Sequence, residues 1–293
     1  IRGIAASERV GLLVKSTAAE AEAQEHLARV NVDTDKVDFH VVPTNRGWLR
    51  DCGPIWAYEH VIPAKRSAAP GSQGKGQKIP VFPTENRDDR RLVALDWGFT
   101  AWAKYPNWQK DTKVPAAIAR VTKHKTVVPM HKCTPVVLEG GGIEVDGEGS
   151  ILVTEEWLLS KTQIRNPGFT RADYEAIFAQ WLGCTHTIWL GKGIVGDDTH
   201  GHIDDISRFV APGKVVTVVE ANKKDANHAL LQDNLKRLKA AKDAKGRRLE
   251  VIELPMPSPV ICEGERLPAS YANFLICNKT VLVPIFGDAN DRI

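Results

Sequence analysis

The sequence predicts an α/β fold in which similar modules are arranged in a fan or propeller. One order of elements recurs along the chain: a short apolar strand, a polar loop carrying acids or histidine, a hairpin and a helix. Hairpins make antiparallel pairs and therefore favour separate modules over a doubly wound parallel sheet. With 293 residues, 43% of them hydrophobic, the chain can bury a substantial core.

The first module begins near the N-terminus. We expect strands at residues 10–14 and 37–42, a helix at residues 18–30 between them, and Asp51 in the polar loop that follows.

A Gly-, Ser-, Pro- and Lys-rich stretch at residues 64–78 predicts a flexible loop inside this module. The Trp-rich part that follows it, with Trp97, Trp102 and Trp108, is either a lid over a site or a satellite apolar cluster. We therefore treat residues 1–293 as one domain and residues 60–112 as an insertion or lid-like segment within it.

The second module has a strand at residues 126–128, an acid at Glu139 and a turn at residues 146–149. Its helix has clear boundaries, because Thr170 can cap the N-terminus with Asp173 three residues on, and Gly183 can end the helix.

Two further modules follow with the same order of elements. The third comprises a strand at 186–190, a polar loop at 191–205, a hairpin of strands 206–210 and 215–219, and a helix at 225–241. The fourth begins with a strand at 249–254 and continues to a hairpin of strands 274–277 and 280–283.

Composition excludes several classes of function. The net charge is only +3, and the Lys-rich run at residues 236–248 alternates with leucines at helical spacing, which indicates the solvated face of a helix and no nucleic-acid partner. No apolar stretch approaches the ~20 residues needed to cross a bilayer. The five cysteines are unclustered and lack zinc or disulfide spacing, so we expect reduced thiols and a cytoplasmic protein. Because the chain begins at Ile1, a removed leader stays open.

The polar loops follow their strands by similar distances. Asp51, Glu139 and His202 should therefore occupy equivalent corners of successive modules. If the modules surround an axis, these corners converge on one site.

Two carboxylates, Asp51 and Asp204, match the paired N–H groups of a planar guanidinium, and the flat ring of Trp48 could hold it. Two alternatives stay open. Arg50 and Asp51 could be a structural ion pair beside a Gly-Pro turn, and Glu139 before three glycines could only stabilise a turn.

His202 and Asp204 form the strongest pair, because alternate residues of an extended segment point to one face. A neighbouring Asp would raise the pKa of His202 and suit it to general acid and base work. His200 shares this parity, so a zinc-binding His-x-His is an alternative; we expect no metal, since the segment leads into a hairpin and no second His cluster follows.

Four motifs carry a resemblance to a known family. They are Trp-x-Arg-Asp-x-Gly-Pro at residues 48–54, Leu-Glu-Gly-Gly at 138–141, Gly-Asp-Asp-Thr-x-Gly-His-Ile-Asp at 196–204, and Arg-Leu-Pro-Ala-Ser-Tyr-x-Asn at 266–273 ahead of Phe-Gly-Asp at 286–288. Together, in this order, they resemble the agmatine deiminase and bacterial peptidylarginine deiminase family of guanidino-group-modifying enzymes.

The resemblance implies a five-bladed α/β propeller with a central site. Asp51 and Asp204 would clamp the guanidinium, Trp48 would line it, His202 would act as general acid and base, and Glu139 would support the binding end. Asn273 is a weaker candidate for a substrate contact. In this family a cysteine thiolate attacks the guanidinium carbon, ammonia leaves, and water hydrolyses the thiouronium intermediate to a ureido product.

The chain departs from the family pattern at the nucleophile, which the family carries in a Gly-rich Ile-His-Cys segment beyond the Phe-Gly-Asp motif. Cys52 has the opposite strand parity to Asp51, and we expect Cys262 and Cys277 to be packing residues. We therefore expect a fragment that lacks the N-terminal segment and the C-terminal nucleophile segment.

Two functions from different classes follow. The first is a hydrolase that converts agmatine to N-carbamoylputrescine and ammonia, as in putrescine biosynthesis, with a small guanidino substrate and no cofactor; arginine and peptidyl-arginine are alternative substrates. The second is a catalytically inactive guanidinium-binding or interaction module. A homodimer is expected from the resemblance only.

Overall fold

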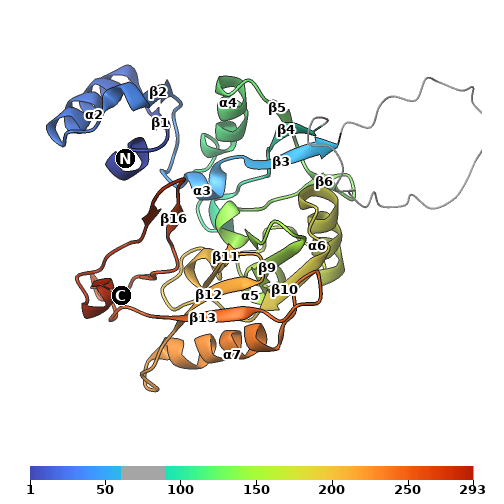
Figure 1. The fold of residues 1–293 in the computed structure, drawn as a ribbon. Helices are drawn as coiled ribbons and strands as arrows, with labels where there is room; N and C mark the ends of the chain where they lie inside the picture. Colours follow the sequence, from blue (N-terminus) through green and yellow to red (C-terminus); the bar gives the residue numbers. More distant parts are fainter. Residues whose placement is uncertain (61–89, 293) are drawn as a thin grey trace, which may run out of the picture.

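A computed structural model describes residues 1–60 and 90–292 (Figure 1). In these residues the strands form several small sheets, and helices alternate with them along the chain. The predicted α/β class with separate small sheets is confirmed.

Three sheets in the described part share one connectivity. A hairpin supplies the first two strands, and a helical crossover returns the chain to a third strand parallel to the second. One sheet has β3 (Ile55–His60) and β4 (Arg90–Leu95), then α4 (Val114–Val121) and β5 (Lys125–Val127). The next has β8 (Glu144–Val145) and β9 (Ser150–Thr154), then α5 (Glu155–Leu159), α6 (Arg171–Ile177) and β10 (His186–Leu190). The last has β11 (Ser207–Ala211) and β12 (Lys214–Val219), then α7 (Ala226–Ala240) and β13 (Glu250–Pro255).

This connectivity corrects the predicted module boundaries. The strand after each helix was expected to open the next module, but it pairs with the preceding hairpin. The reason is that a crossover of this kind returns the chain beside the strand it has just left. The polar loop after each third strand therefore connects two neighbouring sheets.

The two ends of the described chain carry two-stranded sheets. At the N-terminus, α1 (Arg2–Ala5) precedes β1 (Val10–Val14), α2 (Thr17–Arg29) and β2 (Val37–Val41), and the two strands are parallel. At the C-terminus, β16 (Leu275–Ile276) and β17 (Val281–Leu282) form a hairpin. The ends meet, because the Asn278 N–H donates to Glu8 and a Cβ on Gly3 would lie 3.2 Å from Leu282. Figure 1 shows β16 returning beside α3 (Leu49–Cys52).

Two short hairpins lie within the connections. They are β6 (Met130–His131) with β7 (Thr134–Pro135), and β14 (Ile261–Cys262) with β15 (Glu265–Arg266).

The predicted boundaries of the second-module helix are confirmed. Thr170 and Asp173 form a capping box at the start of α6, which satisfies backbone N–H groups that have no partner within the helix. A π-helical turn at Phe178–Leu182 follows, and Gly183 ends it with a φ of 69°.

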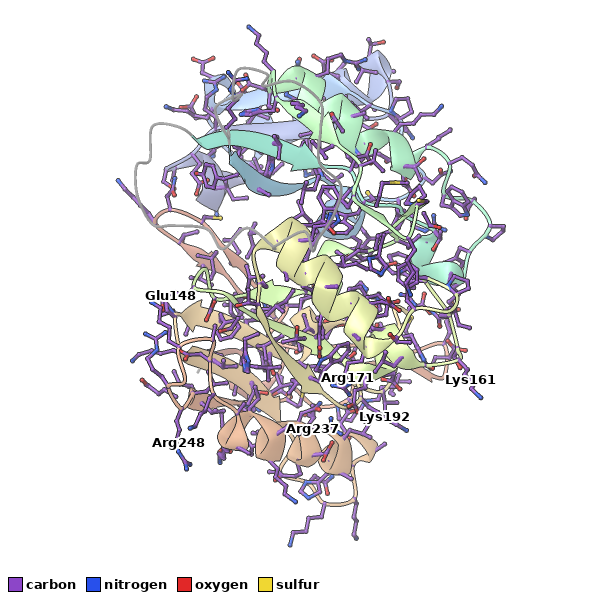
Figure 2. The ribbon with its side chains drawn as sticks, turned by 90° about the vertical axis from the view of Figure 1, so that its right-hand side faces the viewer. Glu148, Lys161, Arg171, Lys192, Arg237 and Arg248 are labelled. Carbon is purple, nitrogen blue, oxygen red and sulfur yellow. The ribbon has the colours of Figure 1, made fainter. Side chains whose placement is uncertain are left out.

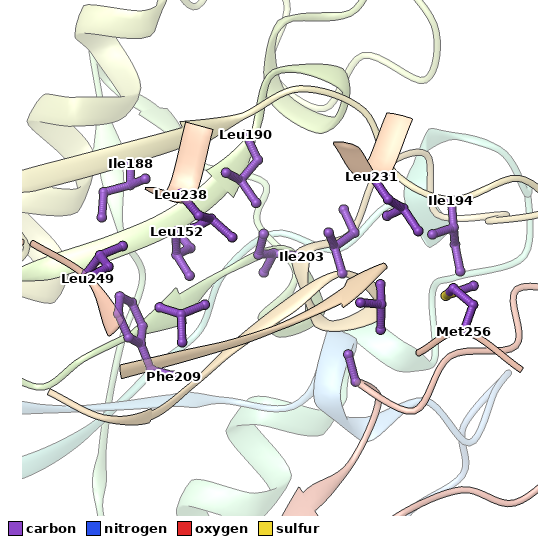
Figure 3. Close-up of a cluster of buried hydrophobic side chains, with 14 residues drawn as sticks. Leu152, Ile188, Leu190, Ile194, Ile203, Phe209, Leu231, Leu238, Leu249 and Met256 are labelled. Atoms are coloured by element: carbon purple, nitrogen blue, oxygen red, sulfur yellow. The ribbon is translucent and has the colours of Figure 1, made fainter. Parts of the chain in front are cut away.

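A large apolar cluster packs α7 against its neighbouring sheets (Figure 3). Leu231 and Leu238 of α7 are fully buried in one cluster with Ile188 and Leu190 of β10. Lys236 on the opposite side of the helix is exposed, which confirms the predicted solvated face. This packing fixes β10, and with it the start of the loop that carries His202.

A second apolar cluster joins α3, the turn around Trp102 and α4. Phe99, Trp102 and Val114 are buried together, and Trp108 is partly buried against them. Residues 61–89 of the predicted lid-like segment lie outside the described residues. Trp102 also lines the cavity described below. A lid function for residues 60–112 stays a prediction.

The outer surface near α6 and α7 is charged (Figure 2). Glu155 accepts ion pairs from Arg171 and Arg237 there, and such exposed pairs contribute little stability individually. In the part of the chain that the structure describes, no helix is long and apolar enough to span a membrane.

Candidate functional site

A cavity of about 490 Å³ lies where the polar loops meet. Its walls come from α3, the Trp102 turn, the 197–205 loop and the segments around Ser270 and Phe286. The lining residues are Arg46, Trp48, Arg50, Asp51, Trp102, Tyr105, Asp197, Asp198, Thr199, His202, Asp204, Asp205, Pro268, Ser270, Asn273, Pro284 and Phe286.

Asp51 lies on the short helix α3 and is buried. Its Oδ1 accepts the Gly141 N–H at 3.1 Å, and its Oδ2 accepts the indole N–H of Trp102 at 3.0 Å. Burial raises the pKa of Asp51, while the charge on His202 and these two donors oppose the rise. The carboxylate is thus oriented by two donors from different parts of the chain.

Trp102 is a site residue that the sequence did not assign to this role. It sits in a turn where Ala101, Trp102 and Ala103 have φ values of 47°, 60° and 52°, a left-handed run that costs roughly 1 kcal/mol or more per residue. Thr100 caps this turn through its hydroxyl. The rest of the fold holds this strained backbone, and the turn directs the Trp102 N–H at Asp51.

A glycine-rich turn, Gly140–Gly142, brings Glu139 behind the cavity. A Cβ on Gly141 would lie 2.6 Å from both Asp51 Oδ1 and His202 Nδ1, and 3.1 Å from Asp204 Oδ2. Only glycine fits there, because all three groups pack around its Cα. The turn is therefore the point of contact between the three polar loops.

Glu139 is fully buried and does not line the cavity. Its carboxylate accepts the indole N–H of Trp157 at 2.7 Å and the Arg165 Nε–H at 3.1 Å. Burial acts to raise the pKa of Glu139, but the charges of Arg165 and His202 outweigh it and lower the pKa. The turn-only alternative for Glu139 is wrong, since an ionised carboxylate here lies 3.5 Å from His202 Nε2. That Glu139 supports the binding end of the pocket stays a prediction.

His202 is buried among three carboxylates. Its Nδ1 lies 3.7 Å from Asp51 Oδ1 and 4.0 Å from Asp204 Oδ1. Burial acts to lower the pKa of His202, but the charges of Asp51, Glu139 and Asp204 outweigh it and raise the pKa to about 9. The predicted rise in the His202 pKa is confirmed, and the ring is an imidazolium at neutral pH.

The loop before His202 is held by one carboxylate. Asp197 accepts backbone N–H groups from Thr199, Gly201 and His202 at 2.7, 2.7 and 3.1 Å. The Gly201 carbonyl accepts the Thr154 hydroxyl at 2.6 Å. These bonds fix the backbone that presents the imidazole.

Asp204 lies in a 3₁₀ turn, Ile203–Asp205, so the predicted extended segment is wrong. The turn still brings Asp204 beside His202. His200, which was expected to share their face, has a φ of 67° and its Nε2 pairs with Ser160 Oγ at 3.0 Å. Among residues 1–60 and 90–292, no group of three or more His, Cys, Asp or Glu side chains is arranged to hold a metal.

Asp204 and Asp205 share one amide donor. Asn273 Nδ2 lies 3.3 Å from Asp204 Oδ2 and 2.8 Å from Asp205 Oδ1, so the predicted site residue Asn273 does reach the site. Burial raises the pKa of Asp204 to about 6, against the opposing charge of His202. Burial and the charge of Asp204 raise the pKa of Asp205 well above its ordinary value. For Asp205, the amide donor Asn273 and the charge of His202 oppose this rise.

Arg50 pairs with Asp204, so the predicted alternative of an Arg50–Asp51 ion pair is wrong. Its Nη1 lies 3.3 Å from Asp204 Oδ2, and its Nη2 donates to the Phe274 carbonyl at 2.8 Å. Trp48 lines the cavity but is 65% exposed, which places it at the mouth.

The described cysteines are free thiols, and none of them lines the cavity. Cys52 is 3% exposed, and burial together with Asp111 and Asp51 raises the pKa of its thiol to about 12. Burial likewise raises the pKa of Cys184 to about 12. Cys277 is half-buried, whereas Cys262 is exposed, so its predicted packing role is wrong. Neither buried thiol is a nucleophile at neutral pH, since only the thiolate attacks.

The residues that converge on the cavity can bind a planar cation and transfer a proton. Asp51 and Asp204 present carboxylate oxygens to one cavity, which can accept the N–H groups of a planar cation. His202 between them carries a proton that it can transfer to a leaving group.

The sequence matches a known protein family and several named relatives. The model of a family described as Porphyromonas-type peptidyl-arginine deiminase matches residues 1–293. A Legionella pneumophila protein named "Putative agmatine deiminase" is 31% identical over 294 aligned residues, covering 100% of this chain and 73% of that protein. A Selenomonas ruminantium protein of the same name is 32% identical, over 99% of this chain and 75% of its own.

Solved structures agree with these relatives. The agmatine deiminase of Enterococcus faecalis superposes with a TM-score of 0.76 at 28% identity, covering 99% of this chain and 74% of that one. A cysteine-to-serine variant of a C. jejuni agmatine deiminase with substrate bound also gives a TM-score of 0.76, at 26% identity, over 100% of this chain and 73% of its own. The chain thus spans about three quarters of the length of these proteins.

Proposed function

The chain belongs to the Porphyromonas-type peptidyl-arginine deiminase family, and from this premise we propose that it supplies the substrate clamp and proton-transfer residue of a guanidino-group hydrolase. The observation that carries the proposal is the convergence of Asp51, His202 and Asp204 on one cavity of about 490 Å³. The relatives named as agmatine deiminases support the same reaction class.

In the proposed reaction, Asp51 and Asp204 accept N–H groups from opposite edges of the substrate guanidinium. A cysteine thiolate attacks the guanidinium carbon, and the resulting tetrahedral intermediate expels ammonia with a proton from His202. Water then adds to the thiouronium carbon and His202 removes one of its protons. The C–S bond breaks as the C=O bond forms, and the remaining O–H proton is released to solvent. The products are one ureido compound, one ammonia and the regenerated thiolate.

We place the attacking cysteine outside residues 1–293. Two observations support this: the thiols of Cys52 and Cys184 are buried with raised pKa values, and the lining of the cavity contains no cysteine in the described residues. The same observation favours a second candidate, a guanidinium-binding module in which the clamp works without a nucleophile.

We also extend the repeat to five modules. β1, α2 and β2 match the crossover part of the three-stranded sheets, and the β16–β17 hairpin matches their first two strands. Five such modules around the cavity would bring successive polar loops to one centre.

We propose agmatine as the preferred substrate. Arginine and its peptides carry a carboxylate or carbonyl near the guanidino chain, and a free cation would be needed to bind a carboxylate. The two arginines of the lining are engaged, since Arg46 bonds to Asn107 and Asp111 while Arg50 bonds to Asp204. Asp198 also lines the cavity, but its carboxylate is paired with Lys104 and Tyr105. The case for agmatine therefore rests on the two engaged arginines.

The test is a colorimetric assay for ureido product with agmatine, arginine and an arginyl peptide as substrates, using the full-length protein. We expect product from agmatine in preference to the other two, and no detectable turnover for Asp204→Asn, which keeps the shape and removes the charge. Turnover by Asp204→Asn close to that of the wild type would contradict the clamp. Agmatine binding without any ureido product would favour the binding module.

A further inference from the structure

The guanidinium groups of Arg50 on α3 and Arg208 on β11 converge on one backbone carbonyl beside the site. Arg50 Nη2 and Arg208 Nη1 both donate to the Phe274 carbonyl at 2.8 Å. Arg208 Nη1 also reaches the Ala272 carbonyl at 3.2 Å, and its guanidinium lies 4.7 Å from the centre of the Phe274 ring. The segment that carries Asn273 is therefore anchored at both of its flanks.

The two arginines differ in what else they touch. Arg208 Nε pairs at 2.7 Å with Glu144 on β8, so its charge is matched by a carboxylate of the neighbouring sheet. Arg50 instead pairs with Asp204 Oδ2 at 3.3 Å, the same oxygen that faces Asn273 at 3.3 Å. Arg50 thus links the carboxylate of the clamp to the segment that carries the amide.

The backbone of Arg50 is fixed as closely as its side chain. A Cβ on Gly140 would lie 2.1 Å from the Arg50 carbonyl oxygen, so the glycine-rich turn packs directly on this residue. Arg50 lies in α3 directly before Asp51, and the same glycine-rich turn that packs on Arg50 also donates the Gly141 N–H to Asp51.

We infer that Arg50 is a positioning residue that holds Asp204 ionised and oriented, and that it couples this carboxylate to Asn273 through the Phe274 carbonyl. Asp204 otherwise faces His202 on its own turn, Asp51 on α3, Asp205 beside it and Arg208 on β11. Of the two arginines, only Arg50 is in ion-pair contact with it.

Removing the Arg50 charge should reduce the ionised fraction of Asp204 to an extent that depends on pH. An opposite charge within ~4–6 Å commonly shifts a carboxyl pKa by about 1–3 units, and the low end applies because the Arg50 side chain is 30% exposed. A rise of about one unit from a pKa of about 6 would lower the ionised fraction of Asp204 roughly fivefold at about pH 6, and hardly at all at about pH 8.5. Loss of a purely structural contact would act equally at both pH values.

The experiment compares Arg50→Met, Arg50→Lys and Arg208→Lys in the full-length protein, with thermal unfolding as the check on folding. Carboxyl NMR titration of Asp204, assigned with Asp204→Asn, is the first readout. The ratio kcat/KM for ureido product from agmatine, measured between about pH 5.5 and 8.5, is the second.

For Arg50→Met we expect the Asp204 pKa to rise by about one unit and kcat/KM to fall about fivefold more at pH 6 than at pH 8.5. Arg50→Lys should restore the wild-type pH profile, because it returns the charge. Arg208→Lys should lower kcat/KM by the same factor at every pH and leave the Asp204 pKa unchanged.

An unchanged Asp204 titration in Arg50→Met, or a loss of kcat/KM by the same factor at every pH, would overturn the inference. The kinetic arm rests on the proposed function, whereas the NMR arm does not. If the wild-type protein forms no ureido product, the proposed function fails and the NMR titration still decides the role of Arg50.

Discussion

Gly141→Ala tests whether the three polar loops meet as closely as the structure shows. The substitution adds one methyl group and removes no functional side chain. That methyl carbon would lie 2.6 Å from Asp51 Oδ1 and His202 Nδ1, and 3.1 Å from Asp204 Oδ2. All of these are closer than ordinary carbon contacts, so each of the three groups must move.

The size of the effect follows from this overlap. Overpacking a closely packed interior costs about 1–3 kcal/mol. In a protein of this size, each kcal/mol lowers Tm by roughly 2 °C, so we expect a decrease of about 2–6 °C. Activity should fall much further, because a displacement of ~1 Å in catalytic groups costs on the order of 100-fold in rate.

The assay pairs thermal unfolding with kcat/KM for agmatine. Gly47→Ala is the matched control, since a Cβ at Gly47 has no atom within 4 Å in the described structure. Gly47→Ala should be unchanged in Tm and activity. A Gly141→Ala protein with wild-type Tm and activity would show that the loops are not packed around this glycine, and the site geometry would have to be abandoned.

Three further predictions follow from the same contacts. Trp102→Phe removes the indole N–H that donates to Asp51 at 3.0 Å. A hydrogen bond to a charged group is worth about 1.5–3 kcal/mol, so kcat/KM should fall roughly 10- to 100-fold. A loss of less than twofold would count against this donor. NMR titration of His202 should give a pKa of about 9. Because this pKa is raised in the folded state, protonated His202 stabilises the fold fully below the unfolded pKa of about 6.5, and this stabilisation disappears as the pH rises through 9. Titration near 6.5 would contradict the three-carboxylate environment. Cys52→Ala should retain kcat/KM within about twofold, since a thiol with a pKa of about 12 supplies no thiolate at neutral pH; complete inactivity with an intact fold would make Cys52 the nucleophile.

The sequence predicted the convergence of Asp51, Glu139 and His202 because a repeated order of elements places equivalent loops at equivalent positions. This argument needs only the spacing of strands and loops, and it succeeded although the strand after each helix was assigned to the wrong module. Asn273 was named only from the family resemblance.

The parts that escaped prediction depend on local conformations with no sequence signature. Trp102 reaches Asp51 from a left-handed turn built on Ala101 and Ala103, and alanine is not a residue that predicts positive φ. His202 and Asp204 meet through a 3₁₀ turn, whereas the prediction relied on strand parity. The pairing of Arg50 with Asp204 spans 154 residue positions by their numbering and depends on the three-dimensional path of the chain.

The sequence contained a signal for Asp205, which was not predicted as a site residue. Asp205 directly follows Asp204, and two adjacent buried carboxylates require that one carry a proton or find a donor. Asn273 is that donor, and it bonds to both.

The central claim is that the cavity formed by Asp51, His202 and Asp204 belongs to an enzyme that replaces one guanidino nitrogen by oxygen from water. The most direct measurement is mass spectrometry of the products when the full-length protein acts on agmatine in water enriched in the heavy oxygen isotope. We expect N-carbamoylputrescine with one heavy oxygen atom in its ureido group, and one ammonia per turnover. Putrescine with urea as products, or agmatine recovered unchanged, would contradict the account.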